Sequence, residues 1–190
     1  MGQDAINALL AERAQLGQRV VRLKGGDPFI FGRGGEEQEY LRRRGIFVEI
    51  VPGITAASGC AAAAGIPLTH RGTSSAVTFV TGQATNSLPN IDWRQFADGE
   101  QTLALYMGAS TAREISTRLI DGGLPGSTSV AVIENGTRPE QRVLRSSLAD
   151  VADVLHNETV TGPAVVVIGA VAELSNEHSI EVASSLAATG

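Results

Sequence analysis

Residues Val20–Glu37, VVRLKGGDPFIFGRGGEE, carry the clearest structural pattern of the chain. This stretch begins with a short apolar run of the length expected for a buried strand. Two glycine clusters follow, at residues 25–26 and 32–35, and they let the backbone adopt positive φ angles and approach a ligand closely. Pro28 favours an extended backbone at Asp27, so that carboxylate can project from the end of the strand. The stretch therefore predicts a strand, a glycine-rich loop and a helix, the order in which open α/β folds form ligand sites.

The composition is that of an ordinary globular chain. It has 190 residues, of which 43% are hydrophobic and 18% are charged, and this length allows one large domain or two small ones. A formal net charge of −5 argues against nucleic acid or an anionic membrane surface as the main partner. No apolar run approaches the roughly 18 residues of a membrane-spanning helix, and no secretory leader is visible. We therefore expect a cytoplasmic protein.

The cysteine and histidine content gives no indication of a metal site. The single cysteine, Cys60, excludes an internal disulfide and a thiolate-based metal cluster. The histidines, His70, His156 and His178, are scattered without the spacing of metal ligands. Because Cys60 lies in a run of alanine, serine and glycine, we interpret it as a buried packing residue rather than a nucleophile. A metal-free protein is the expectation.

Periodicity and turn residues predict two successive sets of α/β elements, joined by the linker-like segment Gly65–Gly72. We expect two subdomains, residues 1–72 and 73–190. The first set consists of a helix capped by Asp4 and ended by Gly17, a strand at Val20–Leu23, a helix at Glu36–Arg44 before Gly45, a strand at Phe47–Val51, and a helix at Ala56–Ala64 with Thr55 as its N-cap. The second set consists of strands at Ala76–Val80, Thr102–Met107, Ser129–Ile133 and Ala164–Ile168, an antiparallel strand at Gln141–Arg145, and helices at Trp93–Ala97, from Thr111 to Gly122, and at Leu148–Leu155. The tail, Ser175–Gly190, is expected to be a helix that frays.

Several predicted strand ends carry glycine or a small polar residue. These turns are Gly25–Asp27, Pro52–Ala56, Met107-Gly108, Asn135-Gly136 and Gly162–Ala164. Each turn alone is a weak signal. In a parallel or mixed sheet they would line one crevice, with the helix behind Thr55 directing its N-terminus inward.

The wider sequence around these turns resembles the uroporphyrinogen-III C-methyltransferases of the tetrapyrrole methylase family. The similarity runs from residue 3 to residue 174 and is carried, in order, by VRLKGGDPFIFGRGGEE, VPGITAASGCAAAAGIPLTHRG, LALYMG, ENGTRPEQRV and GPAVVVIG. It implies an α/β, tetrapyrrole methylase-like fold of two subdomains, with S-adenosylmethionine in the crevice between them. It also implies that the protein is usually a homodimer. The activity that it implies is C-methylation of uroporphyrinogen III at C2 and C7, giving precorrin-2 in sirohaem and cobalamin biosynthesis.

The resemblance assigns roles to residues that match the family's motifs. The cofactor would be bound by Gly25, Gly26, Asp27, Ile30, Thr55, Ala56, Met107, Gly136, Gly162, Pro163 and Ala164. The substrate carboxylates require cations, for which Arg22, Arg33, His70 and Arg71 are the candidates. For Arg22 and Arg71 the alternative is a solvated surface charge. We interpret Lys24 as structural rather than catalytic.

The resemblance does not extend to the strand and glycine-rich loop with which the family begins, or to a segment whose aspartate and lysine are thought to handle protons. We therefore expect the first subdomain to be incomplete, and we assign no catalytic acid or base. Two alternatives stay open. One is a non-catalytic remnant that binds the cofactor or a tetrapyrrole, and the other is a methyltransferase for a later precorrin.

Overall fold

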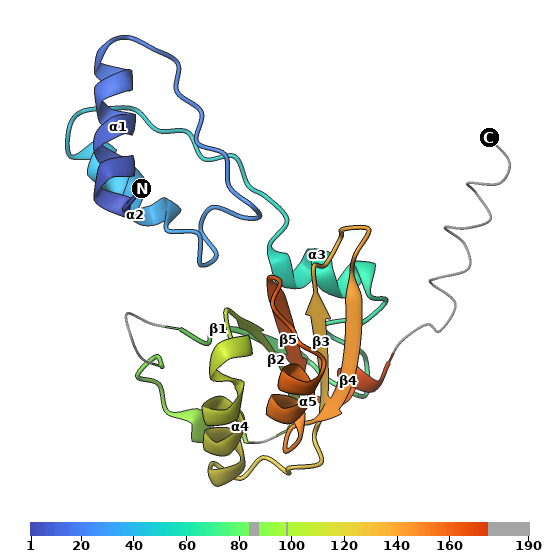
Figure 1. The fold of residues 1–190 in the computed structure, drawn as a ribbon. Coiled ribbons are helices and arrows are strands. Elements are labelled where there is room, and N and C mark those ends of the chain that lie inside the picture. The colour runs from blue at the N-terminus through green and yellow to red at the C-terminus, as the bar shows by residue number, and fades with distance from the viewer. Residues whose placement is uncertain (84–87, 98, 175–190) are drawn as a thin grey trace, which may run out of the picture. The chain divides into compact units, whose positions relative to one another are not determined.

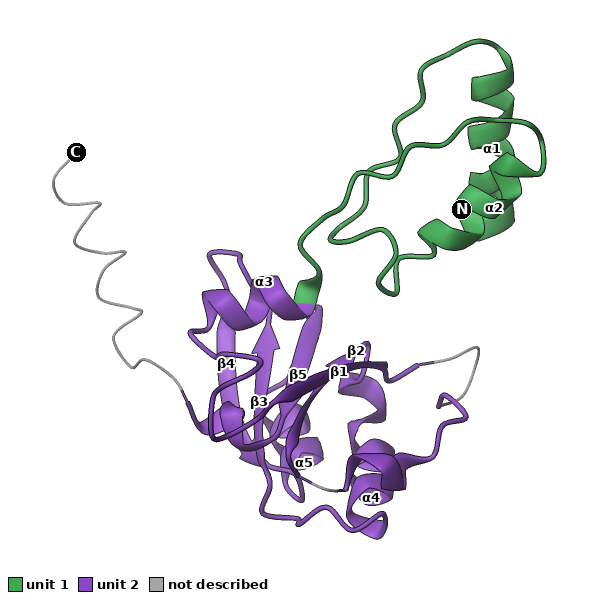
Figure 2. Cartoon of the chain, turned by 180° about the vertical axis from the view of Figure 1, so that it is seen from behind, with its two compact units in different colours: residues 1–56 green, residues 57–190 purple. Residues whose placement is uncertain are grey.

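The computed structural model describes residues 1–83, 88–97 and 99–174 (Figure 1). Its contacts group the chain into two compact units, Met1–Ala56 and Ala57–Gly190 (Figure 2). The sequence predicted a division near Gly72 instead. The difference arises because helix α3, Ala56–Ala63, packs with the second unit. The Ala57 N–H donates to Tyr106 Oη at 3.0 Å, and Gln141 Nε2 donates to the Ala63 carbonyl at 3.3 Å.

The second unit contains a mixed sheet of five strands in the order β1-β2-β5-β3-β4. β1 and β2 are parallel, and all other neighbours are antiparallel. The carboxyl ends of β1, β2 and β3 therefore share one edge of the sheet with the amino ends of β4 and β5. The strands are β1 Ala76–Thr81, β2 Gln101–Tyr106, β3 Ser129–Glu134, β4 Arg142–Ser147 and β5 Ala164–Ile168. Each of the five predicted strands of this half is confirmed, including the antiparallel β4.

One face of this sheet is covered by α4 (Ala112–Asp121), α5 (Val151–Asn157) and a 3-10 helix (Trp93–Phe96), which confirms the three predicted helices (Figure 1). Ile115 and Leu119 of α4 are almost fully buried against the sheet. Burying such a side chain contributes about 1.5–3 kcal/mol. The strand residues of this core are Leu103, Leu105, Val130, Val132, Val166 and Ile168.

The opposite face is covered by α3 and the segment that follows it. At the carboxyl end of β2, Tyr106 accepts the hydrogen bond from Ala57. At the amino end of β2, the Thr102 hydroxyl donates to Ser74 Oγ at 2.9 Å. Tyr106 and Thr102 project from the same face of the strand because they are four residues apart. The chain from Ala57 to Ser74 therefore crosses this face from one edge of the sheet to the other.

The first unit contains two helices that pack together, α1 (Gln3–Gln15) and α2 (Gly34–Arg42). Both predicted helices are confirmed, and α1 ends before Gly17 at φ 76°. The predicted N-cap of this helix, Asp4, is wrong, because Asp4 lies within α1. Gly2 is the N-cap of α1, and it makes no side-chain capping bond.

Two predicted strands of the first unit, Val20–Leu23 and Phe47–Val51, are wrong. Both segments lack strand structure, and Leu23 and Phe47 are 80% and 88% exposed rather than buried. A strand needs a neighbour to pair its N–H and C=O groups. Within the described residues no backbone hydrogen bond joins either segment to another strand.

The predicted C-terminal element, Ser175–Gly190, lies outside the described residues. Among the helices that the structure describes, we find none with the length and hydropathy of a membrane span.

Candidate functional site

In the first unit, the glycine-rich loop lies against the turn that leads into α3. A Cβ atom on Gly53 would stand 2.5 Å from the Gly26 carbonyl oxygen, so only glycine allows this approach. Gly26 itself has φ 130°, and a Cβ there would lie 3.4 Å from the Ile54 carbonyl oxygen and 3.7 Å from the Ala56 nitrogen. The structure therefore brings Gly25–Asp27 together with Thr55 and Ala56, as the sequence predicted.

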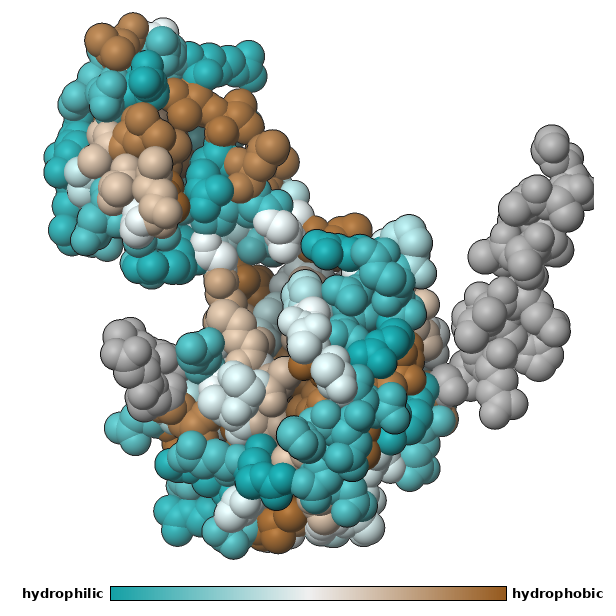
Figure 3. Space-filling view, in the orientation of Figure 1, coloured by the Kyte–Doolittle hydropathy of each residue, from teal (hydrophilic) through white to brown (hydrophobic). Residues whose placement is uncertain are grey.

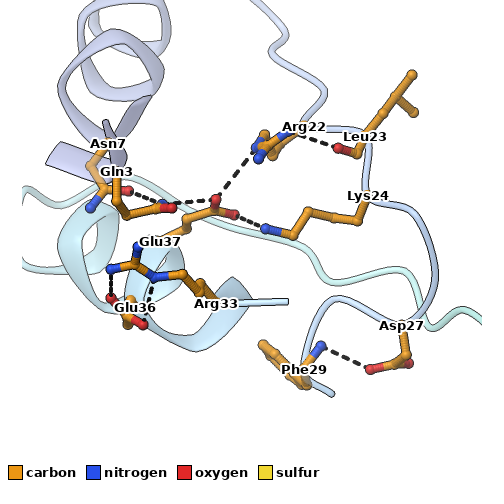
Figure 4. Close-up of polar contacts among 10 residues, drawn as sticks. All are labelled: Gln3, Asn7, Arg22, Leu23, Lys24, Asp27, Phe29, Arg33, Glu36 and Glu37. Carbon is orange, nitrogen blue, oxygen red and sulfur yellow. Dashed lines mark hydrogen bonds and ion pairs between the residues drawn. The ribbon is translucent and has the colours of Figure 1, made fainter. Parts of the chain in front are cut away.

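Asp27 ties these two segments together. Its carboxylate accepts the Phe29 N–H at 2.8 Å (Figure 4). It also accepts the Gly53 N–H at 3.1 Å. The bond from Gly53 is the largest cause of a pKa below the usual value for the Asp27 carboxyl, and the bond from Phe29 is the second. The resemblance assigned Asp27 to the cofactor. The structure gives the same carboxylate a role in organising the loop.

A buried carboxylate, Glu37 of α2, gathers the polar groups of this unit. It accepts from Gln3 Nε2 at 3.0 Å, Lys24 Nζ at 2.9 Å and Arg22 Nε at 3.4 Å (Figure 4). Burial raises the pKa of Glu37, but the bonds from Gln3 and Lys24 outweigh it, so the pKa lies below its usual value. This contact with Glu37 gives Lys24 a structural role. Arg22 contacts the same carboxylate, so it joins the 20–24 segment to α2.

Arg33 is paired as well. Its Nε and Nη2 atoms donate to the two Glu36 carboxylate oxygens at 3.0 Å and 2.7 Å (Figure 4). The sequence proposed Arg33 for a substrate carboxylate, but in the structure Glu36 already binds its guanidinium in a two-pronged geometry. Both side chains are more than half exposed. A ligand carboxylate can therefore reach the guanidinium by displacing Glu36.

In the second unit, the remaining predicted cofactor residues gather at one edge of the sheet. Met107 follows β2, Gly136 follows β3, and Gly162–Ala164 leads into β5. In the register of the sheet, Tyr106 is opposite Val165, and Glu134 is opposite Ala164. A hollow of about 470 Å³ at this edge is lined by Met107 and Gly162–Ala164 together with residues of α5.

The backbone is strained at this edge. Met107 and Asn135, the first residues after β2 and β3, have φ angles of 54° and 51°. Non-glycine residues in this left-handed region cost about 1–3 kcal/mol and cluster at functional sites. The strain therefore supports a binding role for the edge.

The sequence analysis missed Glu134, the last residue of β3. Its carboxylate is buried and accepts bonds from Arg142 and from two N–H groups of the 161–162 turn. The Gly162 N–H is the first cause of a pKa below the usual value for Glu134, and the Arg142 guanidinium is the second. The available signal was an acidic residue that ends an apolar strand and is followed eight positions later by an arginine.

Cys60 is buried in α3, and burial raises the pKa of its thiol. A Cβ atom added to Gly136 would overlap the Cys60 Sγ atom, so the turn after β3 lies directly on the helix. The packing interpretation of Cys60 is confirmed. The structure thus gives Gly136 a packing role beside the predicted cofactor role.

His70 and Arg71 lie at the opposite edge of the sheet. The His70 N–H donates to the Ser74 carbonyl, and Ser74 contacts Thr102 at the amino end of β2. They line a separate hollow of about 570 Å³ with Glu100. A six-residue strand, about 20 Å long, separates this edge from Met107. The structure therefore does not bring His70 and Arg71 to the edge that carries Met107 and Gly162.

No group of three or more potential metal-ligating side chains occurs in the part of the chain that the structure describes. The predicted cofactor residues instead present glycines, small side chains and backbone groups. Such surfaces are typical of α/β proteins that bind an organic ligand at strand ends.

The chain belongs to the tetrapyrrole methylase family. The family model for tetrapyrrole (corrin/porphyrin) methylases matches residues 1–152. Among curated relatives, siroheme synthase 3 of Aeromonas hydrophila is 51% identical over 92% of this chain, and the siroheme synthase of Gluconacetobacter diazotrophicus is 52% identical over 90% of it. This chain spans 37% of the length of each of these relatives.

Solved structures agree with this assignment. The uroporphyrin-III C-methyltransferase of Thermus thermophilus, solved with S-adenosyl homocysteine, superposes with a TM-score of 0.79 at 36% identity, covering 90% of this chain and 74% of that one. A cobalt precorrin-4 methyltransferase superposes with a TM-score of 0.81 at 25% identity, covering 90% and 72%. The tetrapyrrole methylase-like α/β fold predicted from the sequence is confirmed.

Proposed function

We propose that this chain carries out S-adenosylmethionine-dependent C-methylation of uroporphyrinogen III at C2 and C7, giving precorrin-2 for sirohaem and cobalamin biosynthesis. The observation that carries the proposal is the gathering of Met107, Gly136 and Gly162–Ala164 at one sheet edge. The resemblance of the sequence to the family assigns these same residues to the cofactor. The similarity to a uroporphyrin-III C-methyltransferase solved with S-adenosyl homocysteine supports the same cofactor.

The residues present fit such a cofactor. A Cβ atom on Gly25 would meet no other atom within 4 Å, so the loop has open space beside it. We assign Gly25, Gly26, Asp27, Ile30, Thr55 and Ala56 to one part of the cofactor and the sheet edge to its adenosine end. When bound, S-adenosylmethionine supplies a sulfonium methyl group that an electron-rich carbon attacks without a metal. The protein's own contribution is to hold the two reactants in line.

We assign the substrate carboxylates first to Arg33. In its ion pair with Glu36, both side chains are exposed to solvent. Exposed pairs contribute about 0–1 kcal/mol, so exchange of Glu36 for a substrate carboxylate costs little. Arg22 is engaged by the buried Glu37, and His70 and Arg71 lie at the far edge of the sheet, so these three rank below Arg33. We further propose two subdomains, of which the first is incomplete, a homodimer and a cytoplasmic location.

A matched pair of glycine variants tests the cofactor assignment. A methyl group is sterically free at Gly25 in the loop and at Gly35 in α2, because neither Cβ would meet an atom within 4 Å. We expect Gly25→Ala to weaken S-adenosylhomocysteine binding by about tenfold, because the added methyl group would clash with the bound ligand at a cost of about 1.4 kcal/mol. Gly35→Ala should leave the affinity unchanged. Titration calorimetry checks both, and equal affinity in the two variants would contradict the assignment of Gly25.

Activity is tested by incubating the chain with S-adenosylmethionine and uroporphyrinogen III and recording the fluorescence of the oxidised product. The expected product carries two additional methyl groups by mass spectrometry. Cofactor binding without methylation would favour the binding-only alternative. Methylation of a later precorrin instead would favour the alternative to which the similarity with the cobalt precorrin-4 methyltransferase points.

Arg33→Lys tests the substrate assignment. Lysine keeps the charge but loses the two-pronged geometry that suits a carboxylate. We expect weaker tetrapyrrole binding with nearly unchanged S-adenosylhomocysteine binding, measured by calorimetry. If both affinities fall equally, Arg33 organises the loop through Glu36 instead.

A further inference from the structure

We propose that Glu134 is a positioning residue for the adenosine end of the cofactor, because its carboxylate, held by Arg142, fixes the turn at residues 161–164. This inference rests on the proposed function, which assigns Gly162–Ala164 to that end of the cofactor. Glu134 is not assigned to contact the cofactor itself.

The two carboxylate oxygens of Glu134 accept hydrogen bonds from different parts of the chain. Oε1 accepts the Thr161 N–H at 3.0 Å and the Gly162 N–H at 2.7 Å. Oε2 accepts Arg142 Nε at 2.8 Å and Nη2 at 2.6 Å. The Glu134 side chain is 4% exposed. A buried carboxylate is stable only when it is paired and hydrogen-bonded, and here both conditions are met.

Arg142 connects this carboxylate to a second element. Its Nη2 atom also donates to the Glu158 carbonyl at 3.1 Å, just beyond α5. Glu158 is thus held at the start of the segment that leads to the 161–164 turn. The turn is fixed at its centre by Glu134 and at its approach by Arg142.

The residue after Glu134 adds a third contact. The Asn135 N–H donates to the Pro163 carbonyl at 2.9 Å. A Cβ atom on Gly162 would lie 2.6 Å from Asn135 Oδ1, so the turn and the end of β3 are in close contact. Three backbone groups of the turn are therefore held by Glu134 and Asn135, and this fixes the orientation of the groups that remain for a ligand.

Glu134→Gln is the direct test. The amide can still accept from the turn through its oxygen, but its NH₂ group then faces the Arg142 guanidinium, and two donors meet. Glu173→Gln is the matched control. Glu173 is a carboxylate that accepts from Ser129 at the other end of the same strand, away from the turn.

The probes are S-adenosylhomocysteine and adenosine, titrated calorimetrically into the full chain. Glu134→Gln should weaken both by the same factor, at least about tenfold, since a charge-assisted network is disrupted. The KM for S-adenosylmethionine should rise likewise, while the KM for uroporphyrinogen III stays constant. A merely structural role would instead lower the active fraction for every ligand alike. Glu173→Gln should bind both probes like the wild type.

The outcomes separate the two proposals. A wild-type chain that binds neither probe would overturn the proposed function. Normal wild-type binding with unchanged affinity in Glu134→Gln would overturn the positioning role alone. If Glu134→Gln does not fold, Arg142→Gln replaces it, because the new amide can still donate a hydrogen bond to the Glu134 carboxylate while the two guanidinium bonds are lost. Wild-type adenosine affinity in Arg142→Gln would likewise overturn the positioning role.

Discussion

At the scale of single residues, Asp27 combines a predicted ligand role with an observed structural one. Its carboxylate joins the 25–29 loop to Gly53. We expect Asp27→Ala to accelerate amide exchange at Phe29 and Gly53 and to weaken S-adenosylhomocysteine binding. Asp27→Asn retains an acceptor and should be affected less. Hydrogen exchange by NMR checks the first effect, and unchanged exchange in Asp27→Ala would contradict the structural role.

The pH dependence of this contact has a definite sign. The pKa of the Asp27 carboxyl is below its usual value of 3.8 in the folded chain. Its contribution to stability is therefore complete above that value and is lost as the pH falls through the folded pKa. The stability difference between the wild type and Asp27→Ala should shrink as the pH falls below 3.8. Urea unfolding at several pH values measures it.

At the scale of elements, the contact between α3 and the turn after β3 depends on Gly136. A methyl group there would overlap Cys60, and overpacking of this kind costs about 1–3 kcal/mol. We therefore expect Gly136→Ala to lower the free energy of unfolding by that amount. Cys60→Ala in the same chain should restore part of it, because the sulfur atom is removed.

Gly126→Ala is the control for this cycle, since its added Cβ would make only ordinary contacts, the nearest at 3.4 Å. Chemical denaturation of the wild type, Gly136→Ala, Cys60→Ala and the double variant gives the coupling energy between positions 60 and 136. Strict additivity of the Gly136 and Cys60 substitutions would show that α3 does not press on this turn.

At the scale of the whole molecule, the two units differ in how their backbones are paired. β2, β3 and β5 are each paired on both sides. Residues 20–23 and 47–51 have no strand structure and no strand partners among the described residues. Amides in the central strands should therefore exchange at the rate of global unfolding, and amides in the two segments should exchange rapidly. Mass-spectrometric exchange tests this, and uniform protection would contradict it.

The same segments expose apolar side chains. Val21 is 72% exposed and Phe47 88%, and Figure 3 shows hydrophobic surface on the first unit. Exposed apolar segments with unpaired backbone groups recruit other chains. We expect concentration-dependent self-association that Val21→Lys combined with Phe47→Lys reduces. Ile120→Lys, at a partly exposed apolar position of α4, should leave it unchanged in sedimentation experiments.

Local sequence patterns are enough to predict the elements of the second unit. The strands of the second unit read as short apolar runs between turn residues, and β4 was recognised as antiparallel because a turn signal precedes it. The glycine clusters at 25–26 and 32–35 predicted a loop that a ligand can approach closely, whereas the contact of Gly53 with the Gly26 carbonyl appeared only in the structure. The family motifs then selected residues that the sheet brings to one edge.

Contacts between residues far apart in the sequence became known only from the tertiary structure. Val20–Leu23 has the pattern of a buried strand, but a strand exists only when another chain segment pairs with it. The sequence alone likewise does not predict that Arg33 pairs with Glu36. Nor does it predict that Glu134 is buried under a turn 27 residues later. His70 and Arg71 match a family motif, yet the antiparallel register of the sheet and the path of the chain across its face place them at the far edge. Local pattern fixes which elements form, whereas long-range pairing fixes which side chains meet.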